Sequence, residues 1–261
     1  MDRATFRQKC RNREMCWGTM LLEHMSPATV RTMARAGYDW LWLDDEHSPY
    51  AYNVLRDCIR TADDIGIVPI VRVAQLDYAR IAQALDCGAG GIIVPRLETP
   101  EQARHAVDYA KYPPIGRRGF GMRSQVFGKH RMSMHERIDD QQARVLCIQI
   151  ESRLGAQNIE AMLDAGDGQI DFVIFGPADF QMDIGRPDHP DDPELDAAAR
   201  HVSAVCAQRG VGNGLPVTSM NDAQTWLDRG YTIMTYLNDD AFMSDYAEKC
   251  RGELKLLRPG A

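Results

Sequence analysis

Two acidic residues follow apolar runs of the sequence and could hold a metal ion. Glu151 ends the run Cys147-Ile-Gln-Ile-Glu151, and Asp179 comes directly after Gly176-Pro-Ala178. Carboxylate oxygens are the ligands that hard divalent cations such as Mg²⁺ and Mn²⁺ prefer in proteins. Each residue also has a simpler interpretation, because Glu151 could pair with Arg72 and Asp179 could cap a helix. The pair predicts a metal site only if the fold brings the two carboxylates together.

Arg72 and His47 add groups that could stabilise charge and move a proton. Arg72 ends an apolar run, and its planar guanidinium suits a carboxylate or a 2-oxo group, with a salt bridge as the alternative. His47 follows an acidic stretch, and a carboxylate from Asp44 or Glu46 beside its ring would raise its pKa and orient it. Such a histidine can act as a general base near neutral pH. The alternative is a hydrogen-bonded loop histidine without a catalytic role.

Short apolar runs alternate with amphipathic stretches along nearly the whole chain, which predicts parallel strands connected by helices. The expected strands are Cys16–Leu22, Trp40–Asp44, Ile67–Val73, Gly91–Leu97, Val145–Glu151, Phe172–Gly176, Val211–Val217 and Tyr231–Leu237. The expected helices are Pro27–Ala36, Asn53–Ile65, Tyr78–Asp86, Pro100–Ala110, Ala156–Asp164, Glu194–Gln208 and Met220–Asp228. Glycines follow several of these helices, where a left-handed residue is favoured: Gly37, Gly66, Gly88, Gly210 and Gly230.

Eight strand–helix units in 261 residues predict a closed (β/α)₈ barrel, the TIM barrel. The alternative is a doubly wound open sheet, but Gly119-Phe-Gly121-Met-Arg-Ser lacks the third glycine of a dinucleotide fingerprint and follows no strand. We expect residues 1–261 to form one barrel domain with a helical tail from about Asp239. The connection from Tyr112 to Ala143 is long for a barrel, which indicates a functional segment or contact with a partner.

In such a barrel the active site lies at the carboxyl ends of the strands, where the polar residues above would meet. Alternation along a strand puts Cys147, Gln149 and Glu151 on one side. A Schiff-base aldolase needs a lysine inside the barrel, and none of the five lysines falls in an expected strand. The chain also lacks G-x-S-x-G, Walker A and H-E-x-x-H motifs. We therefore expect no imine with the substrate.

Composition limits the class of partner. The formal net charge is -7, which argues against nucleic acid and anionic membranes. The seven cysteines include no C-x-x-C pair, the first sixteen residues lack an apolar signal-peptide core, and no apolar run is long enough to span a membrane. We expect a cytoplasmic protein that acts on small molecules.

The chain resembles the HpcH/HpaI aldolase family, the class II pyruvate-dependent aldolases. The resemblance lies in ordered segments over about Phe6 to Leu237: Trp40-Leu-Trp-Leu-Asp-Asp-Glu-His47, Val71-Arg-Val73, Leu85-Asp-Cys-Gly-Ala89, Tyr112-Pro-Pro-Ile-Gly-Arg-Arg-Gly-Phe-Gly121, Gln149-Ile-Glu-Ser152 and Gly176-Pro-Ala-Asp179. It implies a barrel of the phosphoenolpyruvate/pyruvate type. It also implies a homohexamer, a trimer of dimers, in which the C-terminal helix is exchanged between subunits.

The resemblance also implies the roles of individual residues. Glu151 and Asp179 would bind a divalent cation, Mg²⁺, Mn²⁺ or Co²⁺, and pyruvate would chelate this metal through its carboxylate and 2-oxo oxygens. Arg72 would stabilise the enolate oxygen. The catalytic set implied is His47, Arg72, Asp44 and Asp86, the last contributed across the dimer. The substrate-binding set implied is Gln149, Gly176, Ala178 and Leu215.

The implied reaction is cleavage of a 4-hydroxy-2-oxo acid to pyruvate and an aldehyde through a metal-bound pyruvate enolate. Two departures bear on the substrate: Asp45 stands where the family carries glycine, and Thr235–Asp239 lacks the usual V-G-x-D character. The alternative therefore keeps the fold and metal for another enolate reaction. Examples are oxaloacetate decarboxylation and the bond-forming reactions of macrophomate synthase or a citrate-synthase-like siderophore enzyme. A third hypothesis is a catalytically silent barrel that serves as a scaffold.

Overall fold

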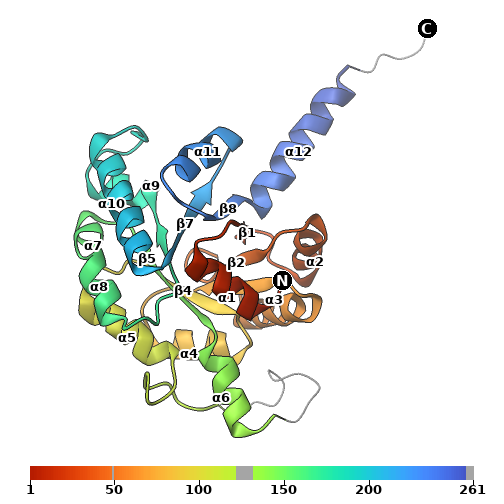
Figure 1. The fold of residues 1–261 in the computed structure, drawn as a ribbon. Coiled ribbons are helices and arrows are strands. Elements are labelled where there is room, and N and C mark those ends of the chain that lie inside the picture. Colours follow the sequence, from red (N-terminus) through yellow and green to blue (C-terminus); the bar gives the residue numbers. More distant parts are fainter. Residues whose placement is uncertain (49, 122–131, 257–261) are drawn as a thin grey trace.

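Eight parallel strands form a closed barrel in the computed structural model, which describes residues 1–48, 50–121 and 132–256 (Figure 1). Each strand pairs with the next along the chain, and the last pairs with the first. The strands are β1 (Cys16–Leu21), β2 (Trp40–Asp44), β3 (Val68–Arg72), β4 (Gly91–Val94), β5 (Val145–Ile150), β6 (Phe172–Phe175), β7 (Gly212–Val217) and β8 (Ile233–Asn238). The predicted TIM barrel is confirmed, and all eight expected strands are present.

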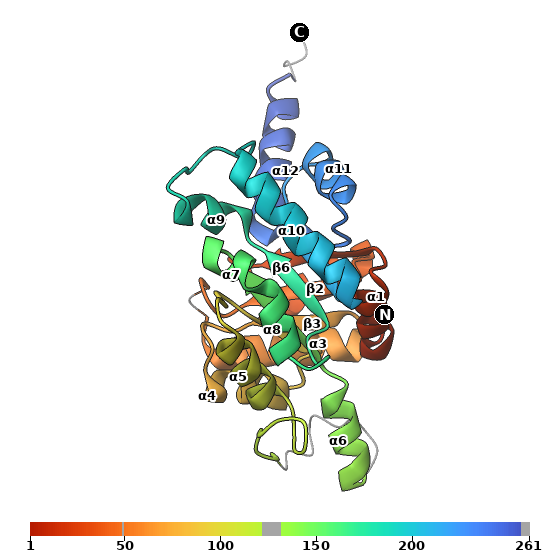
Figure 2. The same ribbon diagram turned by 60° about the vertical axis from the view of Figure 1, so that its left-hand side comes forward.

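The helices lie around the outer face of the barrel, across one end of it, and, for the last helix, away from it (Figures 1 and 2). They are α1 (Arg3–Asn12), α2 (Pro27–Ala36), α3 (Tyr52–Ile65), α4 (Tyr78–Asp86), α5 (Pro100–Ala110), α6 (Met134–Gln142), α7 (Arg153–Gln157), α8 (Ile159–Ala165), α9 (Pro177–Asp183), α10 (Pro193–Arg209), α11 (Met220–Asp228) and α12 (Asp239–Leu254). No helix in the described ranges is both long and apolar enough to cross a membrane.

The predicted helices are present with one difference in the middle of the chain. The expected helix Ala156–Asp164 is two short helices, α7 and α8, because the chain leaves helical geometry at Asn158. The five glycines predicted to follow helices have positive φ angles between 62° and 106°. A residue with a Cβ atom is strained in this conformation, which explains glycine at these helix ends.

Three helices were not predicted from the sequence. They are α1, α6 and α9, and α6 lies within the long connection from Tyr112 to Ala143. Residues 122–131 of that connection are outside the described residues. A capping box, in which the side chains of Ser133 and Glu136 each accept from the other's backbone N–H, fixes the start of α6.

The apolar core has two layers. One fills the space between the barrel and its helices, and the other fills the barrel interior. Phe6 and Cys10 of α1 belong to the inner layer, and the Phe6 ring packs on those of Trp40 and Phe172. Helix α1 therefore closes the amino-terminal end of the barrel, which leaves the carboxyl end open.

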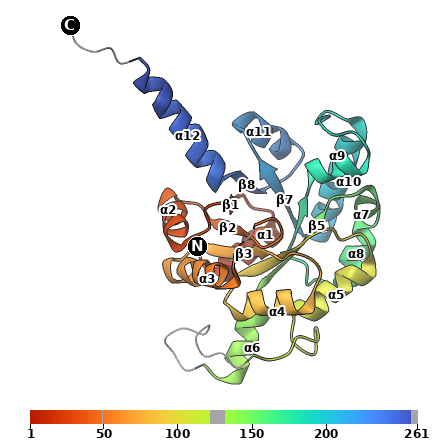
Figure 3. The same cartoon turned by 180° about the vertical axis from the view of Figure 1, so that it is seen from behind.

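The C-terminal helix α12 projects away from the barrel in all three views (Figures 1, 2 and 3). Its first residue, Asp239, is buried and accepts hydrogen bonds from the backbone N–H groups after β1, at Leu22, Glu23 and His24. Beyond this anchor, Met243 and Tyr246 are 57% and 66% exposed. Exposed apolar side chains on a projecting helix are typical of a surface that contacts another chain.

Candidate active site

A pocket of about 520 Å³ opens beside the carboxyl ends of the strands. Five of the residues expected in the site line it: Arg72, Gln149, Gly176, Ala178 and Asp179. They come from the ends of β3, β5 and β6 and from the first turn of α9. The size is typical of a pocket for a small ligand. The fold therefore brings together residues that are separated by up to about a hundred positions in the sequence.

Glu151 follows β5 and is 6% exposed. Its Oε1 accepts a hydrogen bond from Gln149, while its Oε2 has no hydrogen-bond partner among the described residues. Burial, together with the negative charges of Asp179 and Glu46, raises the pKa of this carboxyl to about 7. The site therefore holds a carboxylate that needs a positive partner.

Gly176 allows the Glu151 side chain to lie against the pocket. A Cβ atom at position 176 would be 2.8 Å from Cγ of Glu151 and 2.9 Å from its Oε1. Real Cβ atoms do not approach other atoms so closely, so any larger residue at this position would displace the carboxylate. Glycine at position 176 thus leaves room for the Glu151 carboxyl, whose pKa is raised in part by the charge of Asp179.

The donor atoms in this region suit a hard cation. Oε2 of Glu151 and Oε1 of Gln149 are buried and lack hydrogen-bond partners in the described part of the chain. The described residues contain no group of three or more His, Cys, Asp and Glu side chains that could hold a metal. The protein would therefore supply only two carboxylates to a cation here. A cation at this point would take two carboxylates and complete its shell with water or substrate oxygens, as Mg²⁺ and Mn²⁺ commonly do.

Arg72 at the end of β3 is held on several sides. Its Nε lies 2.6 Å from Oδ1 of Asp44, and one terminal nitrogen lies 3.2 Å from Oε2 of Glu46. The guanidinium carbon is 4.9 Å from the ring centroid of Trp42, within the range of a cation–π contact. The ion pairs of Arg72 are therefore with Asp44 and Glu46 rather than with Glu151, and they fix the direction of its planar fork.

His47 lies on the exposed side of the same cluster. Its ring nitrogen Nε2 is 3.7 Å from Oε2 of Glu46, and the ring is 62% exposed. The backbone N–H of His47 donates to Oδ2 of Asp44 at 3.0 Å. Asp44 thus holds the turn and Arg72, while Glu46 is the carboxylate beside the ring. Burial raises the pKa of Glu46 against the opposing effect of the Arg72 charge.

Asp86 lies outside this pocket. It ends α4, pairs with Arg118 at 2.5 Å, and lines a separate pocket with Tyr52 and Arg80. The chain by itself does not bring Asp86 to His47. A role for Asp86 in catalysis therefore requires a second subunit.

Leu215 does not line this pocket, so its expected contact with the substrate stays a prediction. Leu215 is fully buried in the layer between the barrel and its helices, and its neighbour Pro216 lines the pocket. Successive residues of a strand point to opposite sides, so Leu215 and Pro216 lie on different faces. Pro216 shares the inward side with Gly212 and Gly214, where neighbouring strands leave no room for a Cβ atom.

Sequence reasoning also missed three residues that line the pocket: Trp42, Pro216 and Trp226. It did name Glu46 as a possible partner of His47, and Glu46 lies beside that ring. Trp42 had a readable signal, because it alternates with Leu41 and Leu43 in β2 and so shares the inward face with Trp40. Trp226 had none, since it resembles an ordinary core position of an amphipathic helix. Its place in the site depends on how α11 packs.

The described lysines lie away from the pocket. Lys111 follows α5 and donates to the backbone carbonyls of Gln142 and Arg144. Burial lowers the pKa of its ammonium group to about 8. Lys9 is in α1, and Lys249 and Lys255 are in and after α12, while Lys129 is outside the described residues.

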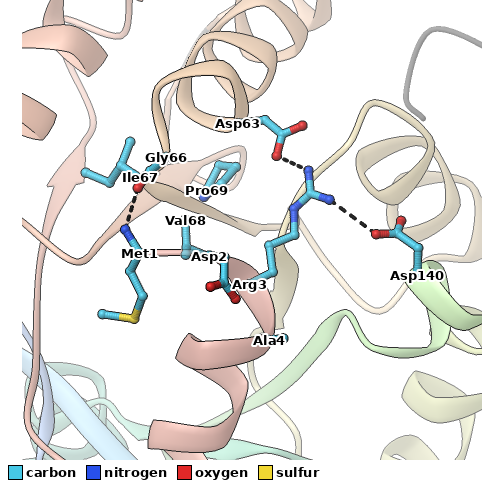
Figure 4. Close-up of a pocket in the computed structure, with 10 residues that line it drawn as sticks. All are labelled: Met1, Asp2, Arg3, Ala4, Asp63, Gly66, Ile67, Val68, Pro69 and Asp140. Carbon is cyan, nitrogen blue, oxygen red and sulfur yellow. Dashed lines mark hydrogen bonds and ion pairs between the residues drawn. The ribbon is translucent and has the colours of Figure 1, made fainter. Parts of the chain in front are cut away.

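A second pocket, of about 470 Å³, lies at the opposite end of the barrel beside α1 (Figure 4). The N-terminal ammonium group donates to the carbonyl of Gly66, and Arg3 pairs with Asp63 and Asp140. These charged groups are paired with one another and hold the start of the chain. We assign this pocket a structural role.

Comparisons with known proteins agree with this geometry. The family model of HpcH/HpaI aldolase/citrate lyase matches residues 18–240. The chain is 32% identical to 2-dehydro-3,6-dideoxy-6-sulfogluconate aldolase of Pseudomonas putida over 91% of this chain and 92% of that protein. It is 29% identical to 5-keto-4-deoxy-D-glucarate aldolase of Salmonella paratyphi C over 86% and 85%.

A solved structure, that of an HpcH/HpaI aldolase from Desulfitobacterium hafniense, has the same fold. Its TM-score is 0.88 at 29% identity, and the match covers 97% of each chain. The residues that the family model matches, 18–240, include every strand of the barrel except the first two residues of β1. The chain therefore belongs to the HpcH/HpaI aldolase/citrate lyase family.

Proposed function

We propose that this protein is a divalent-metal-dependent aldolase that cleaves a 4-hydroxy-2-oxo acid to pyruvate and an aldehyde. The observation that carries the proposal is the buried Glu151 carboxyl, which has a free oxygen and a pKa raised by burial and by Asp179. Such a pair of carboxylates is costly without a cation and well suited to one. The aldolase names of the curated relatives support the same reaction class.

Glu151 and Asp179 would hold the cation, which we expect to be Mg²⁺, Mn²⁺ or Co²⁺. A divalent cation at this point would act as a Lewis acid toward the 2-oxo and carboxylate oxygens of the substrate. Gly176 and Ala178 border the pocket at the start of α9, and Gln149 lies beside Glu151. We propose that these three residues contact the pyruvate half of the substrate.

Arg72 would stabilise the charge that develops during cleavage. When the bond between C3 and C4 breaks, its electron pair moves onto the pyruvate half and negative charge builds up on the 2-oxo oxygen. A guanidinium already oriented by Asp44 and Glu46 needs little rearrangement to donate to that oxygen. C3 then takes up a proton, and pyruvate is released with its methyl group complete.

His47 would take the proton from the 4-hydroxyl, which becomes the carbonyl oxygen of the aldehyde. Oε2 of Glu46 lies 3.7 Å from Nε2 of the His47 ring. Asp44 would be a positioning residue, because it accepts hydrogen bonds from the Arg72 side chain and from the backbone N–H of His47. We propose that Asp86 reaches the site from a neighbouring subunit.

The test measures pyruvate release from a 4-hydroxy-2-oxo acid by the purified full-length protein with Mn²⁺ or Mg²⁺. We expect activity that EDTA removes and that added metal restores. Activity that survives EDTA, or that persists in Glu151→Ala, would contradict the mechanism. Turnover of oxaloacetate or acetyl-CoA in place of any aldol substrate would instead favour the decarboxylase or synthase alternative. Failure to bind both Mn²⁺ and pyruvate in calorimetry would favour a scaffold role.

We also propose that residues 1–261 act as one barrel unit with a C-terminal helical tail, in a cytoplasmic homohexamer built as a trimer of dimers. The exposed apolar residues of α12 support an exchange of this helix between subunits. The proposed contribution of Asp86 also requires a second subunit. Within one chain, Asp86 pairs with Arg118 and lies away from the main pocket.

A further inference from the structure

The main pocket is lined by both polar and apolar residues. The ends of β3, β5 and β6 supply Arg72, Gln149 and Asp179. Four apolar residues also line it, Pro190, Leu195, Pro216 and Trp226, which we call the apolar wall. Its residues come from the loop before α10, from α10, from β7 and from α11. Pyruvate has only three carbon atoms and would bind to the polar residues, so the wall is available to the rest of the substrate.

The indole of Trp226 is fixed in place before any ligand binds. Its Nε1–H donates to Oδ1 of Asp222 at 2.8 Å, and Oδ2 of Asp222 accepts from the backbone N–H of Thr218 at 3.0 Å. The ring meets that of Tyr231 edge-on at 5.3 Å. Each oxygen of Asp222 therefore accepts a hydrogen bond, and these contacts hold the indole in one orientation.

The loop that carries Pro190 is also held by a pocket residue. Oε1 of Gln181 accepts from the backbone N–H of His189 at 2.9 Å, and its Nε2 donates to the carbonyl of Pro177 at 3.2 Å. The amide of Gln181 is thus used to fix the loop. A preformed wall whose polar groups are already bonded gains little from a polar ligand and more from an apolar one.

The charges around the pocket disfavour a second anion. Among the described residues that line it, Arg72 is the single cation, and it already faces Asp44 and Glu46. Asp222 adds a negative charge, whereas Asp179 would face the proposed cation. The proposed cation would be bound by Glu151, Asp179 and the pyruvate oxygens, so a carboxylate at the far end of a substrate would lose water beside Asp222 without a cation of its own.

We propose that the apolar wall binds the aldehyde half of the substrate and selects uncharged aldehydes with an aliphatic or aromatic chain over aldehydes that end in an anion. This inference rests on the proposed aldolase function. In the direction of synthesis, C3 of pyruvate loses a proton and bonds to the aldehyde carbon. The aldehyde oxygen takes up a proton to become the 4-hydroxyl, so no oxidant or further reactant is needed.

The test compares butanal with 4-oxobutanoate in aldol addition to pyruvate, with the full-length protein and Mn²⁺. The two aldehydes have the same chain length and differ in a terminal carboxylate. We expect kcat/KM to be at least about tenfold higher for butanal, since a tenfold preference needs only a modest energy difference. Equal or faster turnover of 4-oxobutanoate would overturn the proposal.

A pair of variants at Thr218 tests the charge argument directly. Thr218 lines the pocket with an exposed side chain, and only its backbone N–H bonds to Asp222. Thr218→Lys adds a cation, and Thr218→Met adds a neutral side chain of similar length. Relative to Thr218→Met, we expect Thr218→Lys to lower the butanal preference at least tenfold. An equal ratio of kcat/KM for butanal to kcat/KM for 4-oxobutanoate in both variants would contradict the proposal. Because both aldehydes are measured with the same variant, this ratio does not depend on that variant's overall activity.

Exchange of the pyruvate methyl protons with D₂O, followed by NMR without any aldehyde, separates the two claims. We expect metal-dependent exchange in the wild-type protein. Exchange combined with a preference for 4-oxobutanoate would overturn the role of the wall and leave the proposed aldolase chemistry in place. Absence of exchange would overturn both, because no carbanion equivalent would form at C3.

Discussion

At the scale of single residues, the site depends on a carboxylate that is unfavourable for the metal-free protein. Glu151 is buried, has one oxygen without a partner, and lies near the charges of Asp179 and Glu46. A group in this position costs stability and serves function only when a cation is present. Stability and activity should therefore respond in opposite directions to its replacement.

Replacing Glu151 by glutamine tests this opposition. In Glu151→Gln at pH 8, we expect kcat/KM for retro-aldol cleavage to fall about a thousandfold, on the order of 4 kcal/mol, because a charged ligand is lost. The metal-free variant should be more stable than the wild type by about 1–3 kcal/mol, since a buried charge is removed. Urea denaturation with EDTA measures the second effect. Glu160→Gln, at an exposed position of α8, is the control.

The raised pKa of Glu151 also predicts a pH dependence of metal binding. The folded-state pKa is about 7 against an ordinary value of 4.5, so protons compete with the cation below pH 7. We expect the Kd for Mn²⁺ to rise up to about tenfold per pH unit as the pH falls from 7 to 5. Calorimetry at several pH values measures this slope. A slope that is unchanged in Glu151→Gln would show that another group titrates.

The same shift affects the stability of the metal-free protein. Between pH 4.5 and 7 the unfolded chain has ionised Glu151, while the folded protein keeps it protonated. The folded state then binds more protons, so stability falls as the pH rises through this interval. Added metal should offset the loss above pH 7, because it favours the ionised carboxylate.

At the scale of secondary-structure elements, α1 completes the barrel at the end remote from the site. Phe6 is fully buried against Trp40 and Phe172, and Arg7 and Arg11 both pair with the buried Asp171. The helix thus adds apolar packing and ion pairs to the amino-terminal end. Its contribution should be to stability rather than to catalysis.

Truncation of the Phe6 side chain tests this separation. Phe6→Ala should lower the free energy of unfolding by about 3–5 kcal/mol, as for other buried aromatic residues. Below the unfolding transition, kcat/KM should stay within about twofold of the wild type, because the pocket is at the opposite end. Gln8→Ala, exposed on the same helix, should change neither quantity. A loss of activity without loss of stability would contradict this assignment.

The sequence predicts the elements better than the faces they present. The eight strands follow from continuous apolar runs, and the helix ends from glycines with positive φ angles. Helix α1 was missed because only Phe6 and Cys10 of its ten residues are buried. Pro216 was not predicted to line the pocket, because an apolar run buried on both sides does not reveal which residues face inward.

The polar end of the site was more predictable than the apolar end. Glu151, Asp179, Arg72 and Gln149 are polar residues at strand ends, where the fold itself makes them conspicuous. Leu195 and Trp226 are ordinary apolar positions of α10 and α11, and only the packing of these helices brings them to one wall. Chemistry is therefore readable from residue types here, while specificity depends on three-dimensional packing.

At the scale of the whole molecule, α12 extends from the barrel with apolar residues exposed on it (Figure 1). If this helix packs on a second subunit, charges at its exposed positions should dissociate the assembly. We expect the double variant Met243→Asp and Tyr246→Asp to have a lower molar mass by light scattering than the wild type. Glu248→Ala, on the same exposed helix, should keep the wild-type mass. An unchanged mass in the double variant would contradict the proposed exchange.

The seal that α1 forms at the base of the barrel constrains how the chain can reach its native state during synthesis. The ion pairs from Arg7 and Arg11 reach Asp171, which is 164 and 160 residues further along the chain. The helix is therefore synthesised well before Asp171 and cannot form these ion pairs until that residue has followed. Until then Phe6 and Cys10 have no interior to enter. Barrel closure should thus be a late event, and the nascent N-terminal segment is the part most exposed to chaperones.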